Sequence, residues 1–197
     1  MTLSAICGMF WLNMPQEAKC VHAIPSDVTL HPGDVILLGS STWRGRLLKL
    51  LERDCLYVHT GILDKEDGHN YLVHADPSHN AVVRESLDAY LSSNRVECVM
   101  VMRVEYGGQE AIRAVDYART QWENAQRFNN TFRYGEGNGL YCTELVLCAW
   151  QAAGVELLPD ISRGDKVFPS ELLKSCRLKR IVECLGEPFT ADRKRRS

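Results

Sequence analysis

The pattern of apolar and polar residues divides the chain into short strands and amphipathic helices. Five runs are apolar, or alternate between apolar and polar residues, as strands do: residues 34–39, 56–63, 71–76, 97–104 and 178–184. The fourth run is apolar on both faces, which predicts a central strand. A Pro32-Gly33 turn precedes the first run.

Two longer segments, residues 43–52 and 109–123, carry apolar residues at helical spacing. In the second segment, one side consists of Ile112, Val115, Ala118 and Trp122. A further short helix is expected to open at Ser170. Together with the strands, these helices predict an α+β fold in which an antiparallel sheet packs against helices.

Another helix is expected to begin close to Cys142. Residues 127–139 are largely polar and contain three glycines, so the chain should arrive there in a loop. Apolar residues then follow at helical spacing until Gly154, a natural helix stop: Leu145, Val146, Ala149 and Ala153. Cys142 therefore falls in the first turn, where unsatisfied backbone N–H groups and the helix dipole favour the thiolate.

Cys142 is thus a candidate nucleophile, although the sequence allows a plainer interpretation. A cysteine on an amphipathic helix is more often a small buried hydrophobe, and that interpretation suits Cys148 in the same helix. What distinguishes Cys142 is its position at the helix start, together with the histidines that the chain offers as bases.

The second and third strands flank Asp67-Gly68, a dipeptide that favours a two-residue hairpin turn. With such a turn, the two residue numbers of each cross-strand pair sum to 135, so His59 lies opposite Asp76. His59 and His74 then share one face of the sheet as diagonal neighbours. A register shifted by one residue would separate them.

A histidine inside an apolar strand needs a polar partner. One such histidine is more often a satisfied core residue than a catalyst. Two on one face, with a cysteine at a helix start elsewhere, favour a catalytic interpretation. His59 is then the candidate base and His74 the candidate orienting residue, with Asp76 as the alternative orienting residue.

The composition is that of one globular domain. The chain has 197 residues, 45% of them hydrophobic, and a formal net charge of -2. This length is sufficient for a full core, and the absence of a basic excess argues against a nucleic-acid partner. We expect one catalytic domain over residues 27–186 and a basic tail over residues 187–197.

The eight cysteines form no metal-binding pattern. No Cys-x-x-Cys sequence occurs, and Cys142 and Cys148 are too far apart around their helix to share an ion. We expect no metal and no other cofactor. The sequence does not decide whether disulfides form, because the even number of cysteines permits them and a domain of this size does not need them.

Residues 1–26 are expected to form a separate N-terminal segment. Its apolar run, residues 3–12, has the length of a signal-peptide core but lacks preceding basic residues, and it is too short to span a bilayer. Either it is a truncated export signal, or it packs on the domain. We favour export, and hence the cell envelope or periplasm over the cytoplasm. Association of the basic tail with a membrane is a weaker expectation.

Two motifs resemble those of a known family. His59-Thr60-Gly61-Ile62, followed by Tyr141-Cys142-Thr143-Glu144-Leu145, resembles the paired signatures His-x-Gly-Ile and Tyr-Cys-Ser-Glu-Leu of the YiiX-like permuted papain-like amidases. These are relatives of bacterial cell-wall cysteine peptidases and of lecithin retinol acyltransferase. Gly33-Asp34-Val35-Ile36 and Phe168-Pro169-Ser170-Glu171-Leu172 are similar to the opening and closing elements of that domain. The resemblance covers about Pro32 to Cys184.

The resemblance implies a circularly permuted papain-like fold, in which the histidine strand precedes the cysteine helix along the chain. By this resemblance, Cys142 is the nucleophile, His59 is the base and His74 is the third polar residue, at a position where relatives often have a glutamate. The chain departs from the family pattern in two places. Thr143 replaces the usual serine, and residues 128–132 only approximate the Tyr-Asp-x-x-Phe stretch that precedes the cysteine motif.

The residues and the resemblance together predict a cysteine hydrolase that cleaves an amide or ester through a thioester. The backbone N–H of Cys142 is the expected oxyanion donor, and Tyr57 and Tyr141 are candidates for the oxyanion site or the cleft wall. The expected substrate is a small amino-acyl, peptide or lipid-linked molecule. The alternatives are an acyltransferase with lipid or amine acceptors, or a non-catalytic binding module that retains the cleft.

Overall fold

The computed structural model describes residue 21 and residues 23–40, 56–93, 96–105 and 108–185. The helix expected over residues 43–52, most of the N-terminal segment and the basic tail lie outside the described residues. Among the described residues, no helix has both the length and the apolar character needed to cross a membrane.

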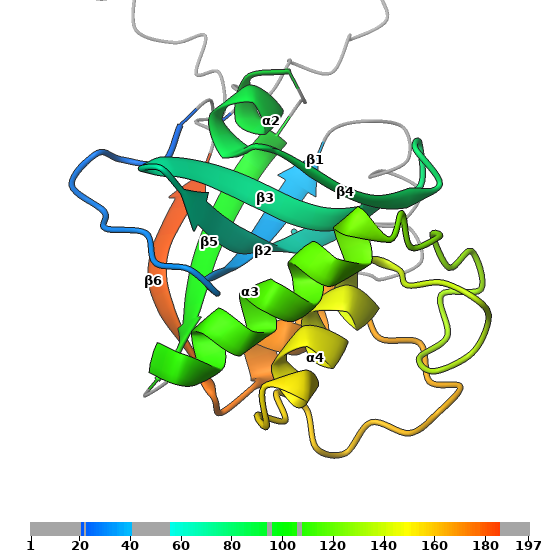
Figure 1. Cartoon of the computed structure of the whole chain (residues 1–197). Helices are drawn as coiled ribbons and strands as arrows, with labels where there is room; N and C mark the ends of the chain where they lie inside the picture. The colour runs from blue at the N-terminus through cyan, green and yellow to red at the C-terminus, as the bar shows by residue number, and fades with distance from the viewer. Residues whose placement is uncertain (1–20, 22, 41–55, 94–95, 106–107, 186–197) are drawn as a thin grey trace, which may run out of the picture.

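Six strands form one antiparallel sheet in the order β4-β3-β2-β1-β5-β6 (Figure 1). Their bounds are Val35–Ser40 for β1, His59–Glu66 for β2, His69–Asp76 for β3, Ala81–Ser86 for β4, Val96–Val104 for β5 and Leu178–Leu185 for β6. β5 lies inside the sheet and is buried along most of its length, as its two apolar faces predict. β4 and β6 are the edges.

Helices cover both faces of this sheet (Figure 1). α2 (Leu87–Ser93) packs on one face, and α3 (Gly108–Glu123) and α4 (Cys142–Ala152) pack on the other. A short 3-10 helix, η1 (Pro169–Lys174), precedes β6. The expected α+β fold with an antiparallel sheet is therefore confirmed.

The β2–β3 hairpin has the register that its turn predicts. Asp67 and Gly68 both have positive φ angles, 51° and 80°, as a turn of type I′ requires. The paired residues run from Ile62↔Val73 to Glu66↔His69, so the numbers of each pair add up to 135. This register is the predicted one, and it places His59 and His74 on the same face of the sheet.

β2 begins at His59 rather than at residue 56, so the predicted start of this strand was wrong. The Val58 N–H donates to the Leu38 carbonyl at 2.9 Å. In the strand register Leu38 pairs with His59, so this hydrogen bond is displaced by one residue along the chain. The irregularity ends the regular strand just before the histidine, and Tyr57 therefore lies outside it.

The buried face of α3 also differs from the prediction. Val115 and Ala118 are buried, but Ile112 and Trp122 are 51% and 38% exposed. The small residue Ala114 takes the inward position instead. Small side chains let α3 pack close to the sheet and α4, which leaves the larger apolar residues at the rim of the contact.

α4 begins at Cys142 and is followed by Gly154 in the left-handed region, as predicted. It is buried on almost every side rather than on one apolar face, because Thr143 and Glu144 are buried as well. β4 and α2 are both short and were not predicted. They matter because each contributes a residue to the candidate site.

Candidate active site

Cys142 is the first residue of α4 and is 8% exposed. Tyr141 before it has extended backbone angles and caps the helix, so the sulfur lies beside backbone N–H groups of the first turn. The Thr143 hydroxyl is 4.0 Å from the sulfur. The sequence therefore placed this cysteine correctly at the helix start.

The Cys142 sulfur reaches the sheet where β2 and β3 separate. The Leu63 N–H donates to Asp34 on the β1 side, so alternate N–H groups of β2, including that of Thr60, point toward β3. The β2–β3 pairs end at Ile62, which leaves the Thr60 N–H without a strand partner. The Thr60 backbone is close enough to the Cys142 sulfur to lower its pKa. The nucleophile candidate thus adjoins the residue that directly follows His59.

His59, His74 and Glu85 form a continuous chain of hydrogen bonds. His59 Nε2 and His74 Nδ1 are 2.8 Å apart, and His74 Nε2 is 2.8 Å from Glu85 Oε1. The three side chains come from β2, β3 and β4, and His74 in the middle is 1% exposed. The predicted proximity of the two histidines is confirmed.

This chain of hydrogen bonds determines which ring nitrogens carry a hydrogen. A carboxylate only accepts, so His74 Nε2 carries a hydrogen and donates it to Glu85. In a neutral His74 the other nitrogen, Nδ1, must then accept, and His59 Nε2 donates to it. The remaining nitrogen of His59, Nδ1, therefore keeps its lone pair and can act as a base.

Tyr90 of α2 packs on both histidine rings. Its ring stacks on His59 with centroids 6.2 Å apart, and it meets His74 edge-on at 5.2 Å. Burial raises the pKa of Tyr90, and the nearby carboxylate of Glu85 and the Cys142 sulfur act in the same direction. The Tyr90 phenol thus lies within electrostatic reach of both the nucleophile candidate and the histidine chain.

His59 and Cys142 both favour their uncharged forms. Burial, followed by the neighbouring His74, lowers the pKa of His59 to about 3. Burial raises the pKa of Cys142, and this outweighs the hydrogen bonds from Thr143 and the backbone of Thr60. The thiolate predicted from the helix position alone is therefore wrong, because the desolvation of Cys142 exceeds the effect of the helix start.

Asp76 does not take the role of the orienting residue. Its carboxylate accepts hydrogen bonds from the Ser78 backbone and hydroxyl and from His79, all within the β3–β4 turn. It still acts on His59 at a distance, because its charge works to raise the pKa of that imidazole. The direct partner of His59 is His74.

Tyr57 and Tyr141 line an apolar pocket beside Cys142. The Tyr57 hydroxyl donates to Glu183 of β6 at 2.5 Å, so its single hydrogen is unavailable for an oxyanion. Tyr141 is 2% exposed, and its hydroxyl has no hydrogen-bond partner among the described residues, although the Val167 backbone amide is close enough to act on its pKa. Both tyrosines are therefore walls of the cleft.

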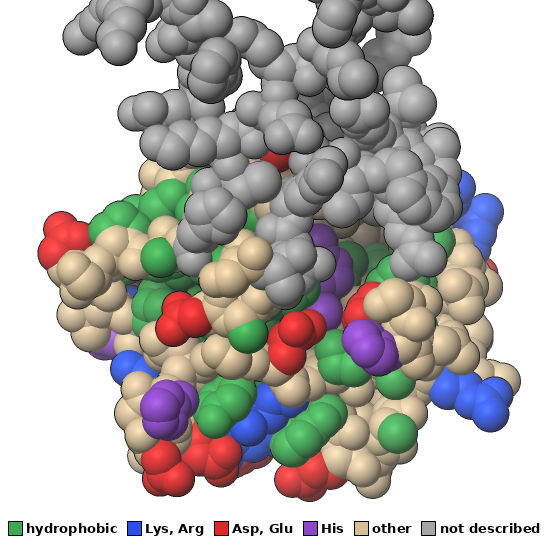
Figure 2. All heavy atoms as spheres, turned by 90° about the horizontal axis from the view of Figure 1, so that it is seen from above, with side chains coloured by type: hydrophobic (Ala, Val, Ile, Leu, Met, Phe, Trp, Pro, Cys, Tyr) green, Lys and Arg blue, Asp and Glu red, His purple; other side chains and the backbone are tan. Residues whose placement is uncertain are grey.

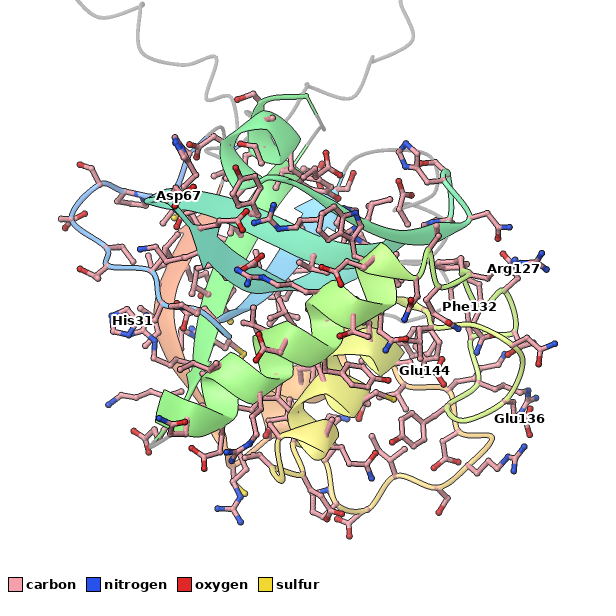
Figure 3. The ribbon with its side chains drawn as sticks, in the orientation of Figure 1. His31, Asp67, Arg127, Phe132, Glu136 and Glu144 are labelled. Atoms are coloured by element: carbon pink, nitrogen blue, oxygen red, sulfur yellow. The ribbon has the colours of Figure 1, made fainter. Side chains whose placement is uncertain are left out.

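The loop before α4 is fastened by Glu144, two residues after the nucleophile candidate. Glu144 is buried and accepts hydrogen bonds from Asn129 Nδ2 at 3.0 Å and from the Gly135 N–H at 2.7 Å. Burial raises the pKa of this carboxyl group, and the bond from Asn129 opposes the rise. Figure 3 shows Phe132, Glu136 and Glu144 on the loop side of α4.

Sequence reasoning missed Glu85 and Tyr90, because it did not predict β4 and α2. A weak signal existed for each. Val82 and Val83 favour a strand, and Leu87, Tyr90 and Leu91 recur at helical spacing. On the face seen from above, histidine, acidic and apolar side chains adjoin one another (Figure 2).

The comparisons with known proteins bear on the fold. No protein-family model matches the chain, and no curated protein matches it. Five chains of solved structures do match. One is the crystal structure of the metalloprotein YiiX from Escherichia coli O157:H7, which is 18% identical with a TM-score of 0.64, over 79% of this chain and 98% of that one. This protein therefore has a YiiX-like fold.

Proposed function

We propose that this protein is a cysteine hydrolase with a circularly permuted papain-like fold, in which Cys142 is the nucleophile. One observation carries the proposal. The backbone of Thr60, the residue that follows His59, is close enough to the Cys142 sulfur to act on its pKa, and Tyr90, which stacks on His59, lies within electrostatic reach of the same sulfur. The His59 ring is hydrogen-bonded to His74, and His74 is hydrogen-bonded to Glu85. A helix-start cysteine next to an oriented imidazole is the arrangement that acyl transfer needs.

The proposed reaction begins from the uncharged pair. When a substrate carbonyl approaches, His59 Nδ1 takes the proton of Cys142, and the sulfur forms a bond to the carbonyl carbon. The backbone N–H of Cys142, at the start of α4, donates to the oxyanion. The C–N or C–O bond then breaks, and the leaving group departs with the proton from His59. Water, activated by His59, hydrolyses the thioester and releases the acid.

His74 and Glu85 serve as positioning residues in this scheme. Nε2 of His59 donates to His74, which holds the imidazole in the tautomer with a basic Nδ1. When His59 gains a proton, the Glu85 carboxylate stabilises the added charge through His74.

A metal ion has no place in the proposed reaction. The solved YiiX structure is described as that of a metalloprotein. In the described part of this chain, no group of three His, Cys, Asp or Glu side chains is arranged to hold a metal. His59 and His74 direct one nitrogen at each other, and the second nitrogen of His74 is used by Glu85. These donors do not fit a metal site.

A burst experiment with p-nitrophenyl acetate tests the proposal. We expect rapid release of p-nitrophenolate followed by slower turnover, because acylation of the sulfur precedes hydrolysis. Mass spectrometry of the quenched protein should find the acetyl group on the peptide that contains Cys142. An acyl-transferring enzyme would show the same burst and a faster second phase when an amine or alcohol acceptor is added.

Cys148→Ala is the matched control for Cys142→Ala. Both cysteines lie in α4, but burial raises the pKa of Cys148 to about 11 and no histidine adjoins it in the described structure. The burst should vanish in Cys142→Ala and persist in Cys148→Ala. Acetylation that is no faster on Cys142 than on Cys148 would refute the hydrolase and leave a binding module.

A further inference from the structure

The pocket beside Cys142 is largely apolar. Phe132, Val167, Phe168 and Pro169 form much of its wall, together with Tyr57 and Tyr141. Its enclosed part is small, about 20 Å³, and continues into an open mouth. None of the described residues that line it carries a formal charge. Such a cavity accepts apolar groups and disfavours charged ones, because a charge would lose its hydration without gaining a partner.

The chemistry of the site decides which part of a substrate enters this pocket. Cys142 and Thr143 belong to the pocket wall, whereas His59 does not. In the proposed reaction the leaving group departs with the proton of His59, so it must lie on the imidazole side. The acyl group stays bonded to the sulfur, so it must lie in the space that the sulfur lines.

The surroundings proposed for the acyl group and for the leaving group differ in polarity, as this assignment requires. On the imidazole side lie His74, Glu85 and the charged Asp76 of the β3–β4 turn. On the pocket side lie mostly aromatic and aliphatic side chains, and the buried Tyr141 hydroxyl there has no hydrogen-bond partner among the described residues. The site therefore combines an apolar acyl side with a polar leaving-group side.

We propose that this pocket is the acyl-binding site and that it selects uncharged, compact acyl groups with a predominantly apolar surface. The inference rests on the proposed function, because it needs Cys142 to become acylated. It adds the chemical class of the acyl group, which the nucleophile and its histidines do not define.

A series of p-nitrophenyl esters tests the selection while the leaving group stays constant. The key pair is the hexanoate and the hemiadipate, which have equally long acyl chains and differ by a terminal carboxylate. We expect kcat/KM for the hexanoate to exceed that for the hemiadipate at least about tenfold, because the pocket desolvates the carboxylate. Cys142→Ala supplies the background rate to be subtracted.

A change of pocket size gives a second, independent measurement. Phe132→Ala should move the preferred chain length upward across the butyrate, hexanoate and decanoate, because it enlarges the pocket without touching the cysteine. Leu173→Ala is the control, since this side chain is exposed and lies outside the pocket. It should keep the wild-type order of the three esters.

The outcomes separate the two proposals. If no ester is cleaved faster by the wild type than by Cys142→Ala, the hydrolase itself is refuted. If esters are cleaved with the hemiadipate equal to the hexanoate, and Phe132→Ala leaves the order unchanged, the hydrolase stands and the acyl-pocket assignment is overturned.

Discussion

Two buried polar networks cross the same three strands, on opposite faces of the sheet. On the α2 face, His59, His74 and Glu85 form the hydrogen-bond chain of the candidate site. On the α3 face, the buried Asp64 pairs with Arg84 at 2.7 Å and with Arg119, whose Nε is 2.8 Å away. Adjacent residues of β4, Arg84 and Glu85, serve one network each because side chains alternate along a strand.

The two networks differ in how they handle charge. Burial alone would raise the pKa of Asp64, but hydrogen bonds from Arg119 and Arg84 outweigh it and leave this pKa lowered. The Asp64 network therefore holds permanent, paired charges. The His59 network has no permanent cation and keeps its first histidine neutral. One network is built to hold the strands together, and the other can take up and release a proton.

The sharpest test of this distinction is His59→Gln. We expect kcat/KM on an activated ester to fall by about a thousandfold or more, because the base that accepts the thiol proton is lost. Glutamine retains a hydrogen-bonding side chain, so the midpoint of urea unfolding should change little. A variant that loses activity and stability together would show that His59 has a structural role like that of Asp64.

Asp64→Asn should give the opposite result. Removing one charge of a buried, hydrogen-bonded pair leaves two arginines without their partner, which typically costs about 3–5 kcal/mol in the free energy of unfolding. Urea denaturation measures this loss, and the kcat/KM of the remaining folded protein should stay near that of the wild type. Glu66→Gln is the control, since Glu66 contacts Arg84 from an exposed position and should change stability by less than about 1 kcal/mol.

Glu85→Gln is expected to have a smaller effect on catalysis. The amide still contacts His74 but no longer stabilises the added charge, so we expect kcat to fall by about 10- to 100-fold with the fold intact. In a double-mutant cycle with His74→Ala, the two losses should not add, because both residues act through His59. Additive losses would mean that Glu85 acts independently of the chain.

The smallest expected effect is on the pH dependence of stability. His59 binds a proton near pH 6.5 when unfolded and only near pH 3 in the folded protein. Between these values the unfolded state holds more protons, so the free energy of unfolding falls as the pH falls from about 6.5 toward 3. Asp64 also has a lowered pKa, so its contribution is lost at more acidic pH, below its ordinary value of 3.8.

Urea unfolding at several pH values separates these two contributions. His59→Gln should flatten the slope between pH 6.5 and 4, where Asp64 contributes little. An unchanged slope in that range would contradict the lowered pKa of His59. Below this range, the loss due to Asp64 should persist in the variant.

The sequence predicted those parts of the fold that local chemistry determines. The Asp67-Gly68 turn set the hairpin register and hence brought His59 beside His74. The polar, glycine-containing loop set the start of α4 at Cys142. These predictions succeeded because a turn type, or a change from loop to apolar helix, depends on neighbouring residues only.

What the sequence did not predict depends on tertiary packing. Glu85 joins the site through a β3–β4 register that follows no short turn signal of the Asp-Gly kind. The charge state of Cys142 was also predicted wrongly, because the helix start is a local feature and the desolvation that overrides it is not. The inward face of α3 is likewise decided by α4 and the sheet, which allowed Ile112 to remain exposed.

The anchoring of the loop by Glu144 has a consequence for how the proposed hydrolase can diversify. The proposed nucleophile Cys142 and the carboxylate that anchors the loop around Phe132 come from the same helical turn, two residues apart. Residues 130–134, between the anchored Asn129 and Gly135, can therefore be exchanged or lengthened while both anchors stay fixed. New acyl preferences are open to mutation at this one loop, and the chemistry at Cys142 need not be rebuilt each time.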